Sequence, residues 1–241
     1  MNYEFKWSML LAAPYAGWIA EAFAATVLLA LGSWVLALVI GVPTGVIRTT
    51  RSRTLRALGA LYVEVFRNVP PIVQLFLWFF VVPLALPAEL QEWWNRLDSA
   101  PYWTALIGIS CFTAARVAEH VRAAIGAVPR GQFNAALSTG LSPVQAYRYV
   151  IAPYALRIVI PSLTSEFLTV FKNTALALTI GVFEITSAAR KIEAWSFKGI
   201  EAYTVASATY IVTTIAVIAL MHWVERRTRI AGLIGQAPER G

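Results

Sequence analysis

The sequence predicts an all-α integral membrane protein, a helical bundle with five transmembrane helices. Three observations lead to this prediction: 58% of the 241 residues are hydrophobic, only 14% are charged, and the mean hydropathy is +0.62. A soluble domain carries about 25% charged residues, and a helix needs about 20 apolar residues to cross the hydrocarbon core. The length suits one membrane domain over residues 1–241.

Four stretches of the chain contain no Asp, Glu, Lys or Arg, and each predicts one transmembrane helix. They comprise 26 residues between Glu21 and Arg48, 21 between Arg67 and Glu89, 17 between Asp98 and Arg116, and 20 between Glu201 and His222. The helical pattern of the third stretch continues to about Gly126.

One more predicted span, the fourth along the chain, runs from Tyr154 to Phe183 and is interrupted by charges. Arg157, Glu166 and Lys172 lie within it. Charged side chains inside a bilayer are costly, and they usually face the interior of a helix bundle or water. They therefore mark the part of this span where we expect function.

The distribution of basic residues predicts the orientation of the chain. Twelve arginines fall on one side of the membrane: in the 48–56 loop, in the 116–148 segment and in the tail (Arg226, Arg227, Arg229 and Arg240). The other side holds five basic residues, which are Lys6, Arg96, Arg190, Lys191 and Lys198. The positive-inside rule places the arginine-rich side and the C-terminus in the cytoplasm, and the N-terminus outside.

The composition excludes several kinds of chemistry. The single Cys111 cannot form an internal disulfide, and His120 and His222 are too few for a metal cluster. The net charge of +7 is spread among the apolar runs, so it does not indicate nucleic-acid binding. The chain has no G-x-x-x-x-G-K-[ST] loop, so we do not expect it to hydrolyse ATP. No catalytic residue, metal or cofactor is predicted.

Residues 130–153 form a polar segment between apolar ones. The run from Ala135 to Leu137 favours a short helix, and Gly140 suits its end because glycine accepts the positive φ found there. Ser142 and Pro143 predict the N-cap and the first position of a second helix. The segment is either a docking surface for another protein or an ordinary amphipathic connector.

This segment resembles the cytoplasmic coupling loop, or EAA loop, in the transmembrane subunits of ATP-binding-cassette importers. The pattern of that loop is E-A-A, three residues, G, nine residues and I-x-L-P. Asn134, Ala135, Ala136, Gly140 and Pro153 stand at the matching places, while Asn134, Val150 and Ala152 depart from the pattern in residue type. The resemblance implies that the loop docks on an ATPase subunit.

Three more stretches are similar to the polar amino-acid branch of these importers. They are "VEVFRNVPPIVQLF" from Val63, "EHVRAAIGAVPRGQ" from Glu119 and "FKNTALALTIGVFEIT" from Phe171. Within that branch the chain is most similar to permeases for glutamate and aspartate. The resemblance implies a type I importer permease fold in the bacterial inner membrane, surrounded by lipid. It also implies ATPase subunits, a second permease subunit (a paralogue or another copy) and a periplasmic amino-acid-binding protein as partners.

Polar residues of the predicted span from Tyr154 to Phe183 are candidates for a substrate path. At 1.5 Å per residue, Glu166 lies roughly 16 Å into its span, near the middle of the bilayer. Lys172 lies further out, and Asn173 falls on nearly the same helix face as Glu166. The alternative for these residues is an interhelical salt bridge that holds the bundle together.

Arg116, Glu119 and Arg122 recur every three residues and form one charged stripe. A local ion pair is the favoured interpretation for Glu119 and Arg122. Arg116 stands where members of the amino-acid branch commonly have an aromatic residue. Because a guanidinium binds a carboxylate through two parallel hydrogen bonds, we hypothesise that Arg116 helps to select acidic substrates.

Asn68 and Gln74 flank two prolines, Pro70 and Pro71, at the start of the second predicted span. The prolines remove two backbone donors, and carbonyls set free in this way can line a polar cavity together with Gln74. A kink that serves only packing is an equally good interpretation.

These observations predict a permease subunit of an ATP-driven importer for glutamate and aspartate, and not an enzyme. An importer of the same class for glutamine, histidine or another polar amino acid is the first alternative, and Arg116 argues against it. A membrane enzyme would need clustered catalytic groups that the sequence lacks. A carrier or channel that works alone is disfavoured by the spacing of the coupling loop.

Overall fold

The computed structural model describes residues 3–228, and the regular structure in that range is entirely helical, as predicted. The long helices are α1 (Tyr15–Ile47), α2 (Arg53–Asn68), α5 (Ala100–Gly126), α8 (Ala152–Asn173) and α10 (Gly199–Thr228). The shorter ones are η1 (Trp7–Leu11), α3 (Pro71–Phe76), η2 (Leu77–Val81), η3 (Val82–Ala85), α4 (Ala88–Asn95), α6 (Arg130–Ser138), α7 (Pro143–Ala146), η4 (Tyr147–Ile151), η5 (Thr174–Ile180) and α9 (Ile185–Ser196).

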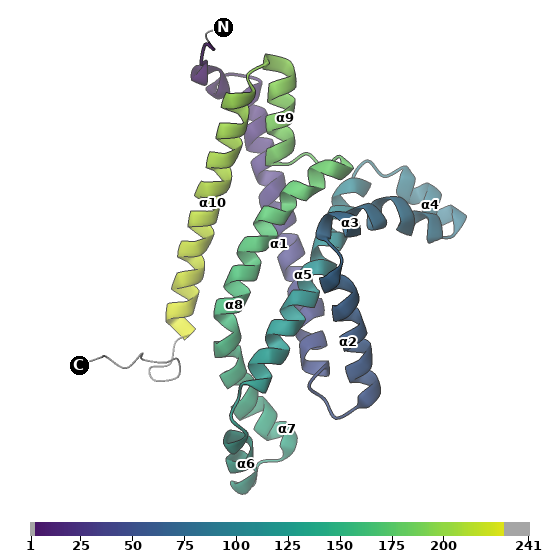
Figure 1. The fold of residues 1–241 in the computed structure, drawn as a ribbon, viewed down its shortest axis with the longest axis vertical. Helices are drawn as coiled ribbons and strands as arrows, with labels where there is room; N and C mark the ends of the chain where they lie inside the picture. Colours follow the sequence, from purple (N-terminus) through teal and green to yellow (C-terminus); the bar gives the residue numbers. More distant parts are fainter. Residues whose placement is uncertain (1–2, 229–241) are drawn as a thin grey trace, which may run out of the picture.

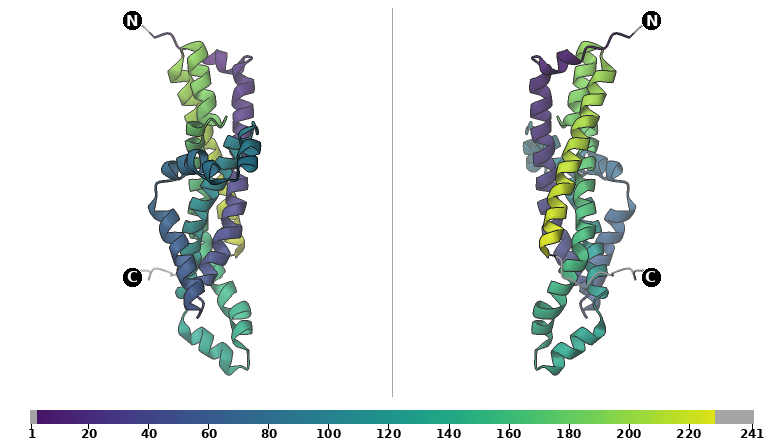
Figure 2. Two further views of the ribbon diagram at one scale, coloured as in Figure 1. Left: turned by 90° about the vertical axis from the view of Figure 1, so that its right-hand side faces the viewer. Right: turned by 90° about the vertical axis from the view of Figure 1, so that its left-hand side faces the viewer.

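The long helices give the molecule an elongated shape with two distinct ends (Figure 1). At one end lie η1, α9 and the start of α10. At the other end lie the turn between α1 and α2 and, projecting furthest, α6 and α7 (Figure 2). Residues 48–56, predicted as a loop, form the turn after α1 and the first turn of α2. They share one end with the 130–153 segment, as the predicted orientation requires. Arg229 and Arg240 of the predicted cytoplasmic tail lie outside the described residues.

Three segments are long and apolar enough to cross a membrane by themselves: Tyr15–Ile47, Pro143–Ile180 and Gly199–Arg227. They correspond to the first, fourth and fifth predicted spans. A fourth span is counted only if α2 and the segment Pro71–Ala85 are taken together, and these two are bent by 104° relative to each other. Length and composition therefore account for three or four of the five predicted spans.

The second predicted span, between Arg67 and Glu89, is not one straight helix. A residue that precedes proline is pushed out of the helical region, because its backbone clashes with the proline ring. Val69 and Pro70 each precede a proline, and both are extended, with ψ values of 130° and 138°. The helix consequently ends at Asn68, and a new one begins at Pro71 in a different direction.

The third predicted span coincides with α5, whose 27 residues exceed the length needed to cross a bilayer. It is not among the helices that qualify by length and composition together. α5 is the central helix of the chain and packs against α1, α2, α3 and α8. A helix covered by protein on several sides tolerates polar residues that lipid would not.

Small residues allow α1 to approach α5 closely. A Cβ atom added to Gly41 would lie 2.6 Å from the carbonyl oxygen of Ala114, and one added to Gly45 would lie 2.6 Å from that of Ala118. In membranes, where water does not drive helices together, close packing of small residues four apart holds them. The G-x-x-x-G pair of α1 thus fixes the position of α5 and of the charged residues on it.

Candidate functional site

The main polar feature inside the bundle is an ion pair between α5 and α8. Nε and Nη2 of Arg116 donate to the two carboxylate oxygens of Glu166 over 2.6 Å and 2.7 Å, and Nε2 of His120 lies 3.0 Å from one of those oxygens. The two helices bring together residues 50 positions apart in the chain. This bidentate contact is the interhelical salt bridge that was the alternative interpretation of Glu166.

The members of this Arg116–Glu166–His120 cluster are exposed to very different degrees. The side chain of Glu166 is 4% exposed, whereas those of Arg116 and His120 are 39% and 34% exposed. A charged side chain that is open at mid-helix cannot be left facing lipid without a large cost. The open side of the cluster therefore requires water or another protein subunit against it.

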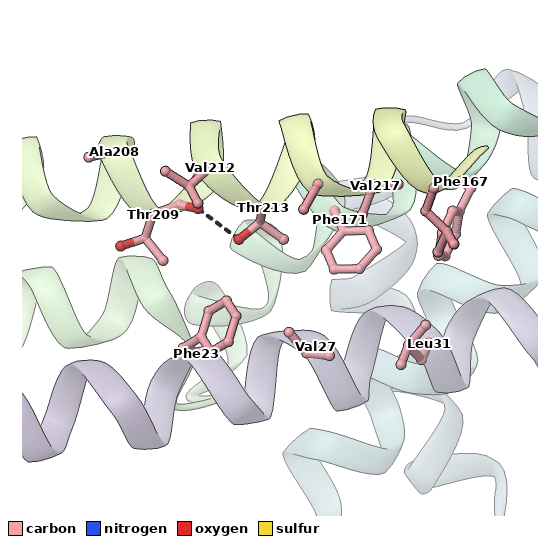
Figure 3. A pocket seen from close by; sticks show the side chains of 12 residues that line it. Phe23, Val27, Leu31, Phe167, Phe171, Ala208, Thr209, Val212, Thr213 and Val217 are labelled. Atoms are coloured by element: carbon pink, nitrogen blue, oxygen red, sulfur yellow. Dashed lines mark hydrogen bonds between the residues drawn. The ribbon is translucent and has the colours of Figure 1, made fainter. Parts of the chain in front are cut away.

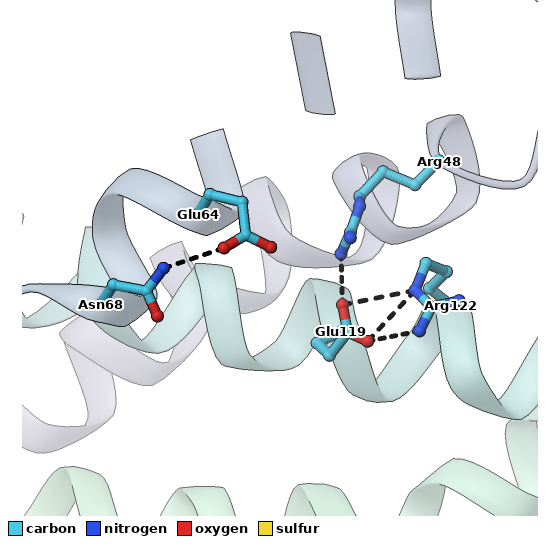
Figure 4. Close-up of polar contacts among 5 residues, drawn as sticks. All are labelled: Arg48, Glu64, Asn68, Glu119 and Arg122. Carbon is cyan, nitrogen blue, oxygen red and sulfur yellow. Dashed lines mark hydrogen bonds and ion pairs between the residues drawn. The ribbon is translucent and has the colours of Figure 1, made fainter. Parts of the chain in front are cut away.

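A second charge cluster lies nearer the end of α5 (Figure 4). Glu119 accepts hydrogen bonds from Nη1 of Arg48 on α1, at 2.5 Å, and from Nε and Nη2 of Arg122 one turn along α5. The prediction that Glu119 and Arg122 pair locally is confirmed, and Arg48 is added to them. This cluster links α1 to α5 and does not include Arg116.

Gln74 holds the break between α2 and α3, whereas Asn68 makes its hydrogen bond within α2. Nε2 of Gln74 donates to the carbonyl oxygens of Phe66 and Val69, over 2.6 Å and 2.8 Å, so the free carbonyls at the end of α2 are bound by protein. Oε1 of Gln74 is buried and has no hydrogen-bond partner among residues 3–228. Nδ2 of Asn68 donates to Glu64 one turn earlier (Figure 4).

Lys172 and Asn173 end α8 and are not part of the Arg116–Glu166–His120 cluster. Lys172 is exposed and lines a shallow groove against α10, together with Tyr210, Ile211 and Thr214 among others. Asn173 is half-buried and precedes the 3-10 helix η5. Of the predicted path residues, the structure therefore joins only Arg116 and Glu166 directly.

In the segment 130–153 a tight turn joins α6 to α7, as predicted, and α7 continues through η4 into α8. Gly140 has a φ of 87° at the end of α6. Ser142 caps α7 in a capping box with Gln145, and Pro143 is the first residue of that helix. Asn134, Ala135 and Pro153 are exposed, but Ala136 is only 6% exposed. The loop is therefore a preformed projection, and Ala135 lies on its surface while Ala136 lies inside.

The conformation of Gly140 predicts how the loop responds to substitution. An L-residue with a side chain costs roughly 1–2 kcal/mol in this left-handed region, and asparagine costs less than alanine. We expect Gly140→Ala to raise the rate of proteolytic cleavage between α6 and α7 by about 5- to 30-fold, and Gly140→Asn to raise it less. Gly131→Ala in α6, where an added Cβ meets no atom within 4 Å, is the matched control. Equal rates for the alanine and asparagine variants at residue 140 would contradict the prediction.

A groove of about 540 Å³ lies between α1, α8 and α10 (Figure 3). Its walls are hydrocarbon, from residues such as Phe23, Val27 and Phe171. The hydroxyls of Thr209 and Thr213 both donate to carbonyl oxygens within α10. Because a zwitterionic amino acid needs charged or polar partners, this groove is unsuited to such a substrate.

Two buried carboxylates outside this site, one before α9 and one in the first turn of α10, are not predicted from the sequence as site residues. Glu184 caps α9, accepting from the backbone N–H groups of Thr186 and Ser187 and from the hydroxyl of Tyr210 on α10, and burial raises the pKa of Glu184. Glu201 accepts from the backbone N–H of Lys6, over 2.8 Å, and from the hydroxyl of Tyr3. They tie α9 and the N-terminal segment to α10. Only the position of Glu184 before a helical run hinted at its capping role.

Comparison with known proteins gives a consistent result. Residues 37–230 match the family described as "Binding-protein-dependent transport system inner membrane component". The chain is 40% identical over 98% of its length to the glutamate/aspartate import permease protein GltJ of Escherichia coli (strain K12), covering 99% of that protein. It is 31% identical to the glutamine transport system permease protein GlnP of the same organism, over 80% of this chain and 84% of GlnP.

A solved structure agrees with these sequence matches. The crystal structure of an amino acid ABC transporter with histidines superimposes with a TM-score of 0.80 at 27% sequence identity, over 94% of this chain and 100% of the other.

Proposed function

Because this chain belongs to the family of binding-protein-dependent transport system inner membrane components, we propose that it is the permease subunit of an ATP-driven importer for glutamate and aspartate. The observation that carries the proposal is the near-full-length similarity to GltJ, a glutamate/aspartate import permease. The chain is homologous to several permeases of amino-acid importers and is placed by its family in the bacterial inner membrane.

In the proposed topology the single membrane domain, residues 1–241, crosses the membrane five times. α5 and the bent pair of α2 with Pro71–Ala85 supply the two spans that length and composition alone leave open. The N-terminus then lies in the periplasm and the C-terminus in the cytoplasm. The gathering of the 48–56 loop and of α6 and α7 at one end supports this orientation (Figure 1).

We assign coupling to the projecting 130–153 loop. Asn134, Ala135, Ala136, Gly140 and Pro153 hold the positions of its EAA pattern. The loop is exposed at its tip, and the start of α7 is fixed by a capping box. Such a preformed loop suits a surface that docks on a partner and moves with it. ATP hydrolysis would belong to that partner, a pair of ATPase subunits. A second permease subunit, a periplasmic amino-acid-binding protein and the surrounding lipid complete the proposed set of partners.

The translocation path is proposed to run along the polar residues of α5 and α8. Arg116 and Glu166 form its centre, and Lys172 and Asn173 lie nearer the periplasmic end of α8. Gln74 and Asn68, at the break between α2 and α3, are further candidates, supported for Gln74 by its buried Oε1, which has no hydrogen-bond partner within residues 3–228. Since Arg116 and His120 are open to the outside of the single chain, a second permease subunit would close the path over them.

The similarity to GlnP keeps a second candidate function open, an importer for glutamine or another polar amino acid such as histidine. Its requirements at the membrane site differ, because glutamine has a side-chain amide in place of the carboxylate. An arginine at the centre of the path suits the carboxylate better. A carrier that works alone is the least supported alternative.

The test is uptake of labelled glutamate into proteoliposomes that contain this chain with its co-purifying subunits, ATP inside and the matching binding protein outside. We expect uptake to require ATP hydrolysis and to fall at least tenfold with excess aspartate, but not with excess glutamine or histidine. Vesicles loaded with a non-hydrolysable ATP analogue serve as the control. Uptake without ATP would overturn the importer assignment. Uptake that glutamine or histidine abolishes would replace the substrate and leave the importer class intact.

A further inference from the structure

Arg116 and the residues around it have distinct roles in substrate binding, an assignment that rests on the proposed function. We infer that Glu166 and His120 are positioning residues: Glu166, which His120 contacts, holds one edge of the Arg116 guanidinium, and the adjacent edge binds the side-chain carboxylate of the amino acid in transit. Arg116 is then the substrate-contacting residue, and Glu166 acts on the substrate only through it.

The guanidinium of Arg116 has five N–H donors, and Glu166 uses only two of them. Glu166 engages Nε and Nη2, over 2.6 Å and 2.7 Å. Within residues 3–228, Nη1 of Arg116 makes no hydrogen bond or ion pair. Nη1 and the remaining proton of Nη2 present two parallel N–H groups, the arrangement that binds a carboxylate in bidentate fashion.

Glu166 and Arg116 differ in exposure. The Glu166 carboxylate is 4% exposed, so a ligand cannot easily reach it, whereas the Arg116 side chain is 39% exposed. Glu166, which fixes the guanidinium, is therefore buried inside the bundle. The guanidinium itself is open to whatever occupies the path.

A substrate carboxylate could also reach Arg116 by displacing Glu166 from it. Such an exchange would leave a buried carboxylate with only His120 beside it, at 3.0 Å. Separating one partner from a buried ion pair is strongly unfavourable, because the remaining charge is uncompensated. Binding to the free edge avoids this cost, so Glu166 stays in place.

The free edge of Arg116 determines the chemical class of the ligand. A carboxylate offers two acceptor oxygens to the two parallel donors. A glutamine side chain offers one acceptor oxygen and an NH₂ group, which would face a donor with another donor. The free edge therefore discriminates in favour of acidic amino acids.

The Glu119 cluster provides a matched control on the same helix. Arg122 also uses Nε and Nη2 on a glutamate, but Glu119 is 25% exposed, is shared with Arg48 and lies near the end of α5. Its residues are placed to join α1 and α5. Loss of its carboxylate should leave ligand binding unchanged.

The experiment measures direct binding of labelled glutamate to the purified complex of this chain with its permease and ATPase partners, without the binding protein. This isolates the membrane site from the selectivity of the binding protein. We expect Glu166→Gln to weaken glutamate binding at least tenfold and to reduce its preference over glutamine, while Glu119→Gln stays within twofold of the wild type. In the Arg116→Gln background, Glu166→Gln should have no further effect, because Glu166 acts through Arg116.

Other outcomes overturn the inference. Unchanged or tighter glutamate binding by Glu166→Gln would show that Glu166 does not position Arg116 for the substrate, and so would additive losses in the double variant. If Glu166→Gln fails to assemble, Glu166→Asp keeps the charge and retracts it by one methylene. Threefold weaker binding supports the inference, and wild-type binding overturns it. Lack of binding by the wild-type complex, when uptake of glutamate is observed, refutes the inference alone; lack of both refutes the proposed function.

Discussion

Replacing Gly41 by alanine is expected to destabilise the chain by about 1–3 kcal/mol, the usual cost of overpacking a tight interface. The added Cβ would lie 2.6 Å from the backbone oxygen of Ala114 and 2.8 Å from Cβ of Val117. Backbone atoms cannot turn aside as a long side chain can, so α1 and α5 must move apart. Gly41→Val should be more harmful and prevent recovery of the assembled complex. The measurement is thermal unfolding of the detergent-solubilised complex.

Gly17 offers a control on the same helix. An added Cβ there meets no atom within 4 Å, so Gly17→Ala changes only the helix propensity, which favours alanine by up to about 1 kcal/mol. The two alanine substitutions should therefore shift the unfolding temperature in opposite directions. A stability for Gly41→Ala equal to or above that of Gly17→Ala would show that α1 and α5 are not held by this contact.

Prediction from the sequence succeeds where the signal is local. The charge-free runs of α1 and α10 specify helices through their length alone. The turn between α6 and α7 is specified by Gly140, which accepts a positive φ, and by Ser142, which caps the next helix. These residues act within four positions of themselves, so their effect can be predicted without knowledge of the fold.

Prediction is weaker where distant parts of the chain determine the outcome. Arg116 and Glu166 are each recognised as unusual in a membrane span, but their bidentate contact depends on the packing of α5 against α8. For the span between Arg67 and Glu89, Pro70 and Pro71 predict a loosened or kinked helix, but the size of the bend, 104°, depends on the packing of the segments on either side. α5 has an ambiguous composition because protein, rather than lipid, covers much of it.

The G-x-x-x-G pair of α1 is visible in the sequence, but the helix that packs against it cannot be identified without the structure. Gly41 and Gly45 are four apart, as small residues in helix interfaces are. Their meaning depends on the backbone of α5 facing them. In the structure, the close approach of α1 and α5 also brings Arg48 to Glu119 and sets the position of Arg116 on the same helix.

Ala135 is expected to be the most sensitive position for assembly with the ATPase. Its side chain is exposed on α6, and a docking surface with a small residue allows another backbone to approach closely. Ala135→Trp should therefore abolish co-purification of the ATPase subunits and lower ATP-dependent uptake at least tenfold, while the chain itself stays folded. The measurement is the ratio of ATPase to permease after affinity purification, together with thermal unfolding of the permease.

Ala136 and Ala88 separate the possible causes of such a loss. Ala136 is buried, so Ala136→Trp should disrupt the α6–α7 loop itself and make it more sensitive to protease, which Ala135→Trp should not do. Ala88 is an exposed alanine at the start of α4, away from the loop, and Ala88→Trp should leave ATPase binding unchanged. If Ala135→Trp retained the ATPase as well as Ala88→Trp does, α6 would not be the docking helix. The 130–153 segment would then be the ordinary connector that its amphipathic pattern also allows.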